Sequence, residues 1–136
     1  MELERERLRA ANRWVKERVL GKIDEEEFSS QAKKLPTLLI NSGLVLTVAY
    51  LQKRWKNEDK EGAGRAKDKP EKVILDYIVD RLREKGLVGK VNSDFLNYLL
   101  EQPSDKISLM FDEALASAEA LKLITEARLS TPKGGG

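Results

Sequence analysis

Hydrophobic residues recur along most of the chain at the three- and four-residue spacing of an amphipathic helix, and the alternation typical of strands is absent. The first such stripe, formed by Leu8, Ala11, Val15 and Val19, predicts a helix over residues 2–20. The same spacing continues to the end of the chain. The pattern therefore predicts an all-α protein.

The second helical pattern contains a proline and a glycine. Asp24 and Glu27 form a capping-box arrangement, which predicts that a helix begins there. Pro36 is expected to kink or restart this helix. Gly43 is expected either to end a helix in the left-handed conformation or to allow close contact between helices. The helical pattern then resumes over residues 44–55.

Residues 56–70 have almost no apolar content and include two glycines, so we expect an exposed, mobile loop. Three further helices are predicted, over residues 70–86, 93–100 and 104–129. Ser104 is the expected N-cap of the last helix. Together these elements predict one domain over residues 1–129, a bundle of about six helices, followed by a disordered tail over residues 130–136.

The longest stretch without a charged residue is LPTLLINSGLVLTVAYL, residues 35–51. A membrane-spanning helix needs about 20 mostly apolar residues. This run is shorter, and it contains Asn41, Ser42 and Thr47, whose polar side chains would need protein partners in lipid. It also contains Pro36, which removes a backbone hydrogen bond from a helix. We therefore expect it to lie in the protein core and not in a membrane.

Composition removes most catalytic chemistry. The chain has no cysteine and no histidine, which excludes disulfides, thiolate catalysis, histidine-based triads and most zinc sites. The acidic run at residues 24–27 lacks convergent oxygen ligands, and Glu113 and Glu119 do not share a helix face. The segment GAGRAKDK lacks the spacing of a phosphate-binding loop. We expect neither an enzyme nor a cofactor.

Charge and the first residues bear on partners and location. The chain carries 25 basic and 23 acidic residues, a net charge of +2. This balance permits nucleic-acid binding on one face but does not require it. The opening segment MELERERLRA lacks the apolar core of a signal peptide, so we expect a cytoplasmic protein.

Arg5, Arg9, Arg13 and Lys16 form a basic ridge on the first predicted helix, opposite its apolar stripe. Such a ridge can follow a phosphate backbone. The alternative is a solvated face, in which the ridge pairs with acidic residues three or four positions away, namely Glu2, Glu6 and Glu17.

A second basic cluster lies in the segment LQKRWK, where Lys53, Arg54 and Lys56 surround Trp55. Basic residues beside an aromatic ring are suited to holding a single-stranded backbone. Alternatively, Trp55 closes the core at the end of its helix. The last helix adds two further candidates, Lys122 and Arg128.

The central segment resembles the signature of a known family, the small helical subunit of type III-B, or Cmr-type, CRISPR RNA-targeting complexes. The matching elements are Leu35-Pro36, Asn41-Ser42-Gly43-Leu44 and Thr47-Val48-Ala49-Tyr50-Leu51. The segment departs from the signature at Ser42, which is inserted between Asn and Gly, and at Tyr50, where Phe is common. SAEALKLITEAR, over residues 117–128, is similar to the closing helix of that family.

This resemblance implies a non-catalytic subunit that stacks with copies of itself and with other type III-B subunits, and that is monomeric when isolated. It also implies that the subunit lines the channel in which CRISPR RNA pairs with target RNA. The RNA-binding candidates are then Arg9, Arg13, Lys16, Lys53 and Arg54. Two other functions remain open: a helical adaptor that binds only protein, and a free-standing helical nucleic-acid-binding module.

Overall fold

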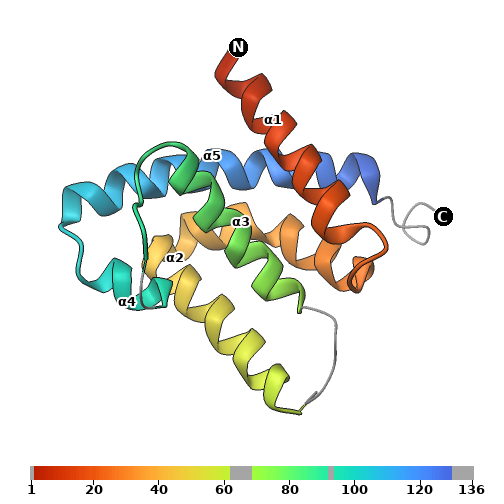
Figure 1. Ribbon diagram of the computed structural model, residues 1–136, viewed down its shortest axis with the longest axis horizontal. Coiled ribbons are helices and arrows are strands. Elements are labelled where there is room, and N and C mark those ends of the chain that lie inside the picture. Colours follow the sequence, from red (N-terminus) through yellow and green to blue (C-terminus); the bar gives the residue numbers. More distant parts are fainter. Residues whose placement is uncertain (1, 62–68, 92–93, 130–136) are drawn as a thin grey trace.

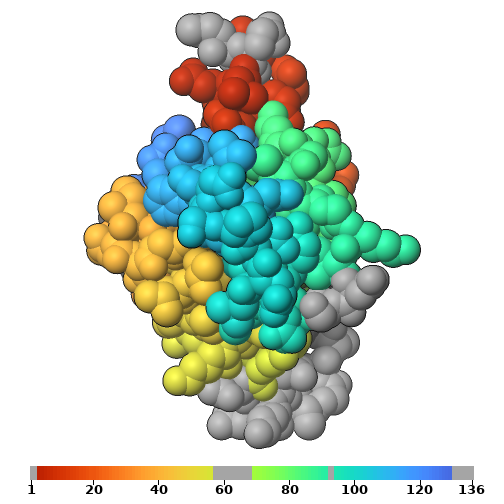
Figure 2. Space-filling model, turned by 90° about the vertical axis from the view of Figure 1, so that its left-hand side faces the viewer, coloured from red at the N-terminus to blue at the C-terminus, as the bar shows by residue number. Residues whose placement is uncertain are grey.

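The computed structural model describes residues 2–61, 69–91 and 94–129, and these ranges contain helices and no strand. The elements are α1 (Glu2–Trp14), the π-helical turn η1 (Val15–Val19), α2 (Glu25–Glu61), α3 (Pro70–Glu84), α4 (Phe95–Leu100) and α5 (Ser104–Arg128). Figure 1 shows α5 across the back of the bundle, α1 and α3 crossing in front of it, and α4 at one end. The first turns of α1 extend beyond the rest of the bundle (Figures 1 and 2).

The all-α prediction is confirmed, but the count of about six helices is not. The two helices predicted before and after Gly43 form one long helix, α2, with a break at that residue. Its regular backbone is interrupted only at Gly43, with φ 83° and ψ 172°. Pro36 lies within the helix, whose backbone stays helical there, so the helix does not restart at Pro36. Thr47, which is fully buried, donates a hydrogen bond to the Leu38 carbonyl across the break at 3.3 Å.

Gly43 is needed for its backbone conformation, not for space. Its φ is positive, but its ψ is far from the left-handed helical value, and this combination is accessible almost only to glycine. A Cβ atom built at Gly43 would meet nothing within 4 Å. Both expectations for this residue, a left-handed helix end and a close helix contact, are therefore replaced by an extended break inside α2.

The first predicted helix divides into α1 and η1. In the π-helical turn, the Leu20 amide donates to the Val15 carbonyl at 3.0 Å, a five-residue hydrogen bond. Val15 and Val19 remain fully buried, so the apolar stripe continues through the turn. Gly21, with φ +72°, follows the turn and ends this segment as its position predicts.

Three boundaries in the second half of the chain test the predicted ones. The helix before Gly86 ends in a Schellman motif, in which the Leu87 amide donates to the Leu82 carbonyl at 2.9 Å. Ser104 is not the N-cap of α5, because Pro103 is extended and its carbonyl accepts the first helical hydrogen bond. The predicted loop 56–70 is also partly wrong, since α2 continues through Glu61. Residues 62–68 and the predicted tail lie outside the described residues.

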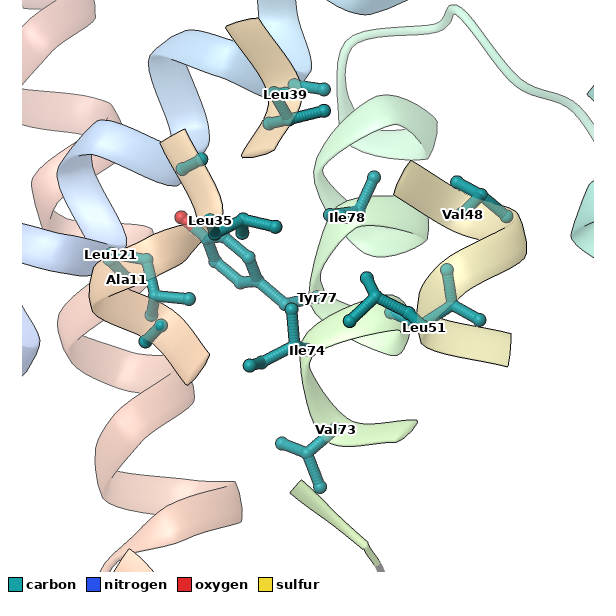
Figure 3. Close-up of a cluster of buried hydrophobic side chains, with 14 of the residues drawn as sticks. Ala11, Leu35, Leu39, Val48, Leu51, Val73, Ile74, Tyr77, Ile78 and Leu121 are labelled. Carbon is teal, nitrogen blue, oxygen red and sulfur yellow. The ribbon is translucent and has the colours of Figure 1, made fainter. Parts of the chain in front are cut away.

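The core is built mainly where α2, α3 and α5 meet (Figure 3). Leu35, Leu39 and Val48 of α2 are at most 1% exposed, and the ring of Tyr77 from α3 lies beside Leu35. The segment Glu25–Lys56 is long and apolar enough by composition to cross a membrane. It instead contributes one face to the core of this bundle, as expected for the uncharged run.

The uncharged run is not buried on all sides, however. Ile40 is 61% exposed and Leu46 is 64% exposed, one on each side of the break at Gly43. The expectation that this run lies in the protein core therefore holds for one of its faces only. The second half of α2 has one face in the core and one face on the surface.

Candidate nucleic-acid interface

The basic ridge of α1 lies on the surface of the bundle. Arg5, Arg9, Arg13 and Lys16 are all exposed, whereas Ala11 on the opposite side of the helix is fully buried. Within the described part of the chain, none of these four side chains forms an ion pair or a hydrogen bond with another side chain. The helical period that buries the apolar stripe therefore leaves these cations available to an external partner.

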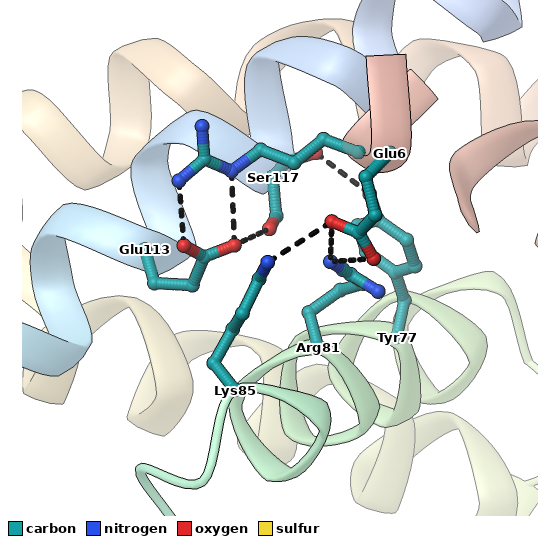
Figure 4. Close-up of polar contacts among 7 residues, drawn as sticks. Glu6, Tyr77, Arg81, Lys85, Glu113 and Ser117 are labelled. Carbon is teal, nitrogen blue, oxygen red and sulfur yellow. Dashed lines mark hydrogen bonds and ion pairs between the residues drawn. The ribbon is translucent and has the colours of Figure 1, made fainter. Parts of the chain in front are cut away.

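Glu6, one of the acidic residues expected to neutralise the ridge, points in another direction. Its carboxylate accepts hydrogen bonds from Arg81 Nη2 at 2.9 and 3.0 Å and from Lys85 Nζ at 3.0 Å (Figure 4). Partial burial alone would raise the pKa of Glu6, but the hydrogen bonds from Lys85 and Arg81 hold that pKa below its usual range. Glu6 therefore does not pair with the ridge, and it connects α1 to α3.

A second ion pair on the same side of α1 fixes the helix against α5. Arg7 donates from Nε and Nη2 to the two carboxylate oxygens of Glu113, at 3.0 and 2.7 Å (Figure 4). The Ser117 hydroxyl donates to the same carboxylate at 2.8 Å. Burial alone would raise the pKa of Glu113, but the hydrogen bonds from Arg7 and Ser117 outweigh this effect and hold the pKa below its usual range. Glu113 thus has a structural partner, and Glu119 is exposed.

The ridge is held in place by these inward contacts. The Tyr77 hydroxyl donates to the Ser117 carbonyl at 2.8 Å, and burial raises the pKa of this phenol. Arg81 is only 1% exposed and therefore needs the carboxylate of Glu6. The ion pairs that fix one side of α1 are partly buried, and they orient the opposite side, with Arg9 and Arg13, toward solvent.

The second basic cluster is divided by the structure. Lys53 is exposed and has no ion-pair partner among the described residues. Arg54 Nε lies 3.1 Å from an oxygen of Glu71, a fully buried carboxylate, and Arg54 Nη2 lies 3.8 Å from Glu27. The guanidinium of Arg54 therefore serves first as the counter-ion of Glu71. Lys53 is the better placed of the two predicted contacts for an external phosphate.

Trp55 belongs to the edge of the core. Its ring is half-buried against the hydrophobic cluster, and its Nε1 is buried without a hydrogen-bond partner. The ammonium groups of Lys56 and Lys72 lie 5.9 and 5.6 Å from the ring centroid. Trp55 therefore closes an edge of the core, as one of the two interpretations expects, but not at a helix end, because α2 continues through Glu61.

The two candidates on the last helix are less suited to an interface. Arg128 is exposed, but its Nε donates to the side-chain oxygen of Asn12 at 2.9 Å. Lys122 is half-buried. A groove of about 390 Å³ lies between α1 and α5, lined by apolar residues such as Leu8 and Leu123, by Glu4 and Glu119, and by Arg7. Because Arg7 already pairs with Glu113, the remaining apolar and acidic lining suits a protein neighbour better than an RNA phosphate.

The acidic run at the start of α2 serves the helix itself. Asp24 accepts a hydrogen bond from the Glu27 amide at 3.0 Å, and Glu25 accepts one from the Gly21 amide at 2.7 Å. These carboxylates therefore satisfy backbone donors at the helix N-terminus. Over residues 2–61, 69–91 and 94–129, no group of three or more acidic side chains is placed to hold a metal ion.

Fold and surface together define a small all-α bundle with one exposed basic ridge, held by buried ion pairs on its inner side. Residues 3–128 match the family described as CRISPR-associated protein (Cas_Cmr5). This match covers almost the whole chain, so the chain belongs to the Cas_Cmr5 family, the small subunits of type III-B CRISPR complexes. It is therefore a subunit of a Cmr complex, in a family of structural and generally non-catalytic proteins. No curated protein matches the chain.

Proposed function

We propose that this chain lines the channel that holds the paired CRISPR RNA and target RNA, and that Arg9, Arg13 and Lys16 contact RNA phosphates. The observation that carries the proposal is the exposed, unpaired state of these three cations, whose expected neutraliser Glu6 is bound to Arg81. Membership of a Cmr complex, together with this basic face, supports the proposal that the chain lines the channel.

The spacing of the ridge suits a backbone contact. Arg9 and Arg13 lie four positions apart in α1, and Lys16 lies three positions further on in η1, which places successive cations about 6 Å and about 4.5 Å apart along the helix axis. Contacts of this kind position an RNA strand but do not read its sequence, which base pairing with the guide already does. Lys53 contributes a further phosphate contact from α2, and Arg54 contributes mainly by neutralising Glu71.

Assembly supplies the rest of the affinity. A ridge of three or four charges is a small footprint, so the isolated chain binds RNA more weakly than the assembled complex, in which copies stack and act together. The groove between α1 and α5, with its apolar and acidic lining, supports contact with neighbouring subunits. The protein acts in the cytoplasm and cleaves no RNA by itself, with or without magnesium or manganese.

The test is a Cmr complex assembled with the Arg9→Ala/Arg13→Ala/Lys16→Ala variant. Capture of target RNA should weaken equally for unrelated target sequences. Each lost contact should reduce the slope of log affinity against log salt by about 0.7–0.9. The matched control is Lys34→Ala/Arg83→Ala/Lys90→Ala, which removes three exposed cations outside the ridge.

The variant and the control should assemble equally well, because all six side chains are exposed. Unchanged affinity and an unchanged salt slope in the ridge variant would mean that the ridge is a solvated face. An RNA-facing surface would then have to lie elsewhere on the chain.

A further inference from the structure

The second half of α2 presents a surface stripe that contains an accessible aromatic ring. Leu46 is 64% exposed, Tyr50 is 37% exposed, and Lys53 is also exposed. Their spacing of four and three positions places all three on one face of the helix. Residues 44–56 contain three basic residues and no acidic one. The stripe therefore combines the aromatic ring of Tyr50 with the positive charge of Lys53, which has no ion-pair partner among the described residues.

The ring of Tyr50 has a fixed neighbour. The guanidinium of Arg54 lies 5.6 Å from the ring centroid, a cation–π distance. Arg54 is itself anchored by the fully buried carboxylate of Glu71 at 3.1 Å. A ring restrained in this way loses little further conformational freedom when a planar group stacks on it.

Trp55, the aromatic residue that the sequence favours in this cluster, is the less accessible of the two. Trp55 is half-buried against the core, whereas Tyr50 is exposed. Lys56 and Lys72 also lie within 6 Å of the centroid of the indole ring. An incoming base would reach Tyr50 more readily than Trp55.

We propose that Tyr50 is a stacking platform for an unpaired base of single-stranded RNA, and that Lys53 binds the neighbouring phosphate. The proposal rests on the proposed function and adds a single-strand contact to the phosphate contacts of the ridge. Stacking on an aromatic ring beside basic residues is the usual way in which proteins hold single strands without reading their sequence. The positive charge of the stripe favours RNA over an apolar protein neighbour.

The test compares the full-length wild-type chain with Tyr50→Leu and Tyr50→Phe. The probes are a fluorescent single-stranded oligouridylate and an RNA duplex of equal length, each titrated at several salt concentrations beginning at low salt. Tyr50→Leu keeps apolar bulk but removes the aromatic face. It should weaken single-strand binding by between about 5-fold and about 150-fold. Tyr50→Phe should bind like the wild type.

The salt dependence identifies the kind of contact. Tyr50→Leu should leave the salt slope unchanged, because no charge is lost, whereas Lys53→Ala should reduce it by about 0.7. Duplex binding should be the same for Tyr50→Leu and the wild type. Leu46→Ala, one turn earlier on the same stripe, is the matched control and should bind the single strand normally. Thermal melts of all variants confirm that each is folded.

Equal single-strand binding by Tyr50→Leu and the wild type would overturn the proposal, as would the absence of any measurable wild-type binding at low salt. The stripe would then be assigned to a protein contact. This outcome is separable from failure of the proposed function, which is measured on the assembled complex through Arg9, Arg13 and Lys16 and does not depend on Tyr50.

Discussion

Arg81 Nη2 donates a hydrogen bond to Glu6 Oε1 at 2.9 Å, joining two residues that are 75 positions apart in the chain. Arg81 is 1% exposed, and the side chain of Glu6 is 38% exposed. The carboxylate of Glu6, on α1, therefore serves as the counter-ion of the buried guanidinium of Arg81, on α3. It both orients the basic ridge and compensates a charge that the core would not otherwise tolerate.

Glu6→Gln should destabilise the fold, because it leaves the buried guanidinium of Arg81 without a counter-ion. Removing a charged hydrogen-bond partner from a buried group costs about 1–3 kcal/mol. Solvent screening at the partly exposed Glu6 places the expected loss toward the lower end of this range. Urea unfolding measures the effect. Glu119→Gln, which changes an exposed carboxylate on α5, is the control and should change little.

Equal free energies of unfolding for Glu6→Gln and Glu119→Gln would show that the ion pair with Arg81 adds nothing to stability. Glu6→Gln should also weaken target-RNA capture by the complex, because the carboxylate of Glu6 holds the basic ridge in place. The effect should be smaller than that of removing the ridge cations, since Glu6 itself does not contact RNA.

Stability should depend on pH in the acid range. The pKa values of Glu6 and Glu113 are both lowered in the folded protein. A carboxylate with a depressed folded pKa stabilises the fold above its unfolded pKa of about 4.3, and this contribution is lost as pH falls through the folded value. The melting temperature should therefore change little above about pH 5 on account of these groups and fall below about pH 4.

The double variant Glu6→Gln/Glu113→Gln should be less stable than the wild type at neutral pH. It should also lose less stability on acidification, since two of the linked protons are no longer taken up. Melting temperatures measured at constant ionic strength would show this as converging curves. Parallel curves for the variant and the wild type would assign the acid sensitivity to other carboxylates.

Gly43→Ala should destabilise the fold by about 1–3 kcal/mol, because a residue with a Cβ atom is strained at φ 83° and ψ 172°. The loss comes from the backbone alone, since the space around the position is open. Gly89→Ala is the matched control: its surroundings are equally open and its φ is not positive. Equal melting temperatures for the two variants would contradict the extended break at Gly43.

Local signals were predictable from the sequence. The ends near Gly21 and Gly86 depend on one residue that favours positive φ, and the start at Pro70 depends on a residue suited to the first helical turn. The exposure of Arg9 and Arg13 was equally predictable, because the helical period that buries one face fixes the other.

Features that depend on contacts between distant helices could not be predicted from the sequence. The helix α2 continues through Pro36 and is interrupted at Gly43, although the local signal at Pro36 also favours a break. The commitment of Arg54 to Glu71 joins residues 17 positions apart across two helices. Neither the burial of Glu71 nor the exposure of Tyr50 was predictable from the sequence, because both are set by how α3 packs on α2.

The last prediction separates a structural role for Arg54 from an RNA-binding one. Arg54→Met removes the only charged group that bonds to the buried carboxylate of Glu71 among the described contacts. It should destabilise the fold by about 1–2 kcal/mol, a value reduced because the Arg54 side chain is 38% exposed. Lys53→Met, on the neighbouring exposed residue, should leave stability unchanged.

The double variant Arg54→Met/Glu71→Leu should recover most of the stability lost in Arg54→Met, because replacing both members of a buried pair by apolar residues is often neutral. Urea unfolding of Arg54→Met, Glu71→Leu, the double variant and the wild type completes the double-mutant cycle. If Arg54→Met is as stable as the wild type while its complex loses RNA affinity and salt slope, Arg54 is a phosphate contact, as the sequence suggested. If stability falls and is restored in the double variant, the guanidinium is first a structural counter-ion, and Lys53 is the RNA contact of this turn.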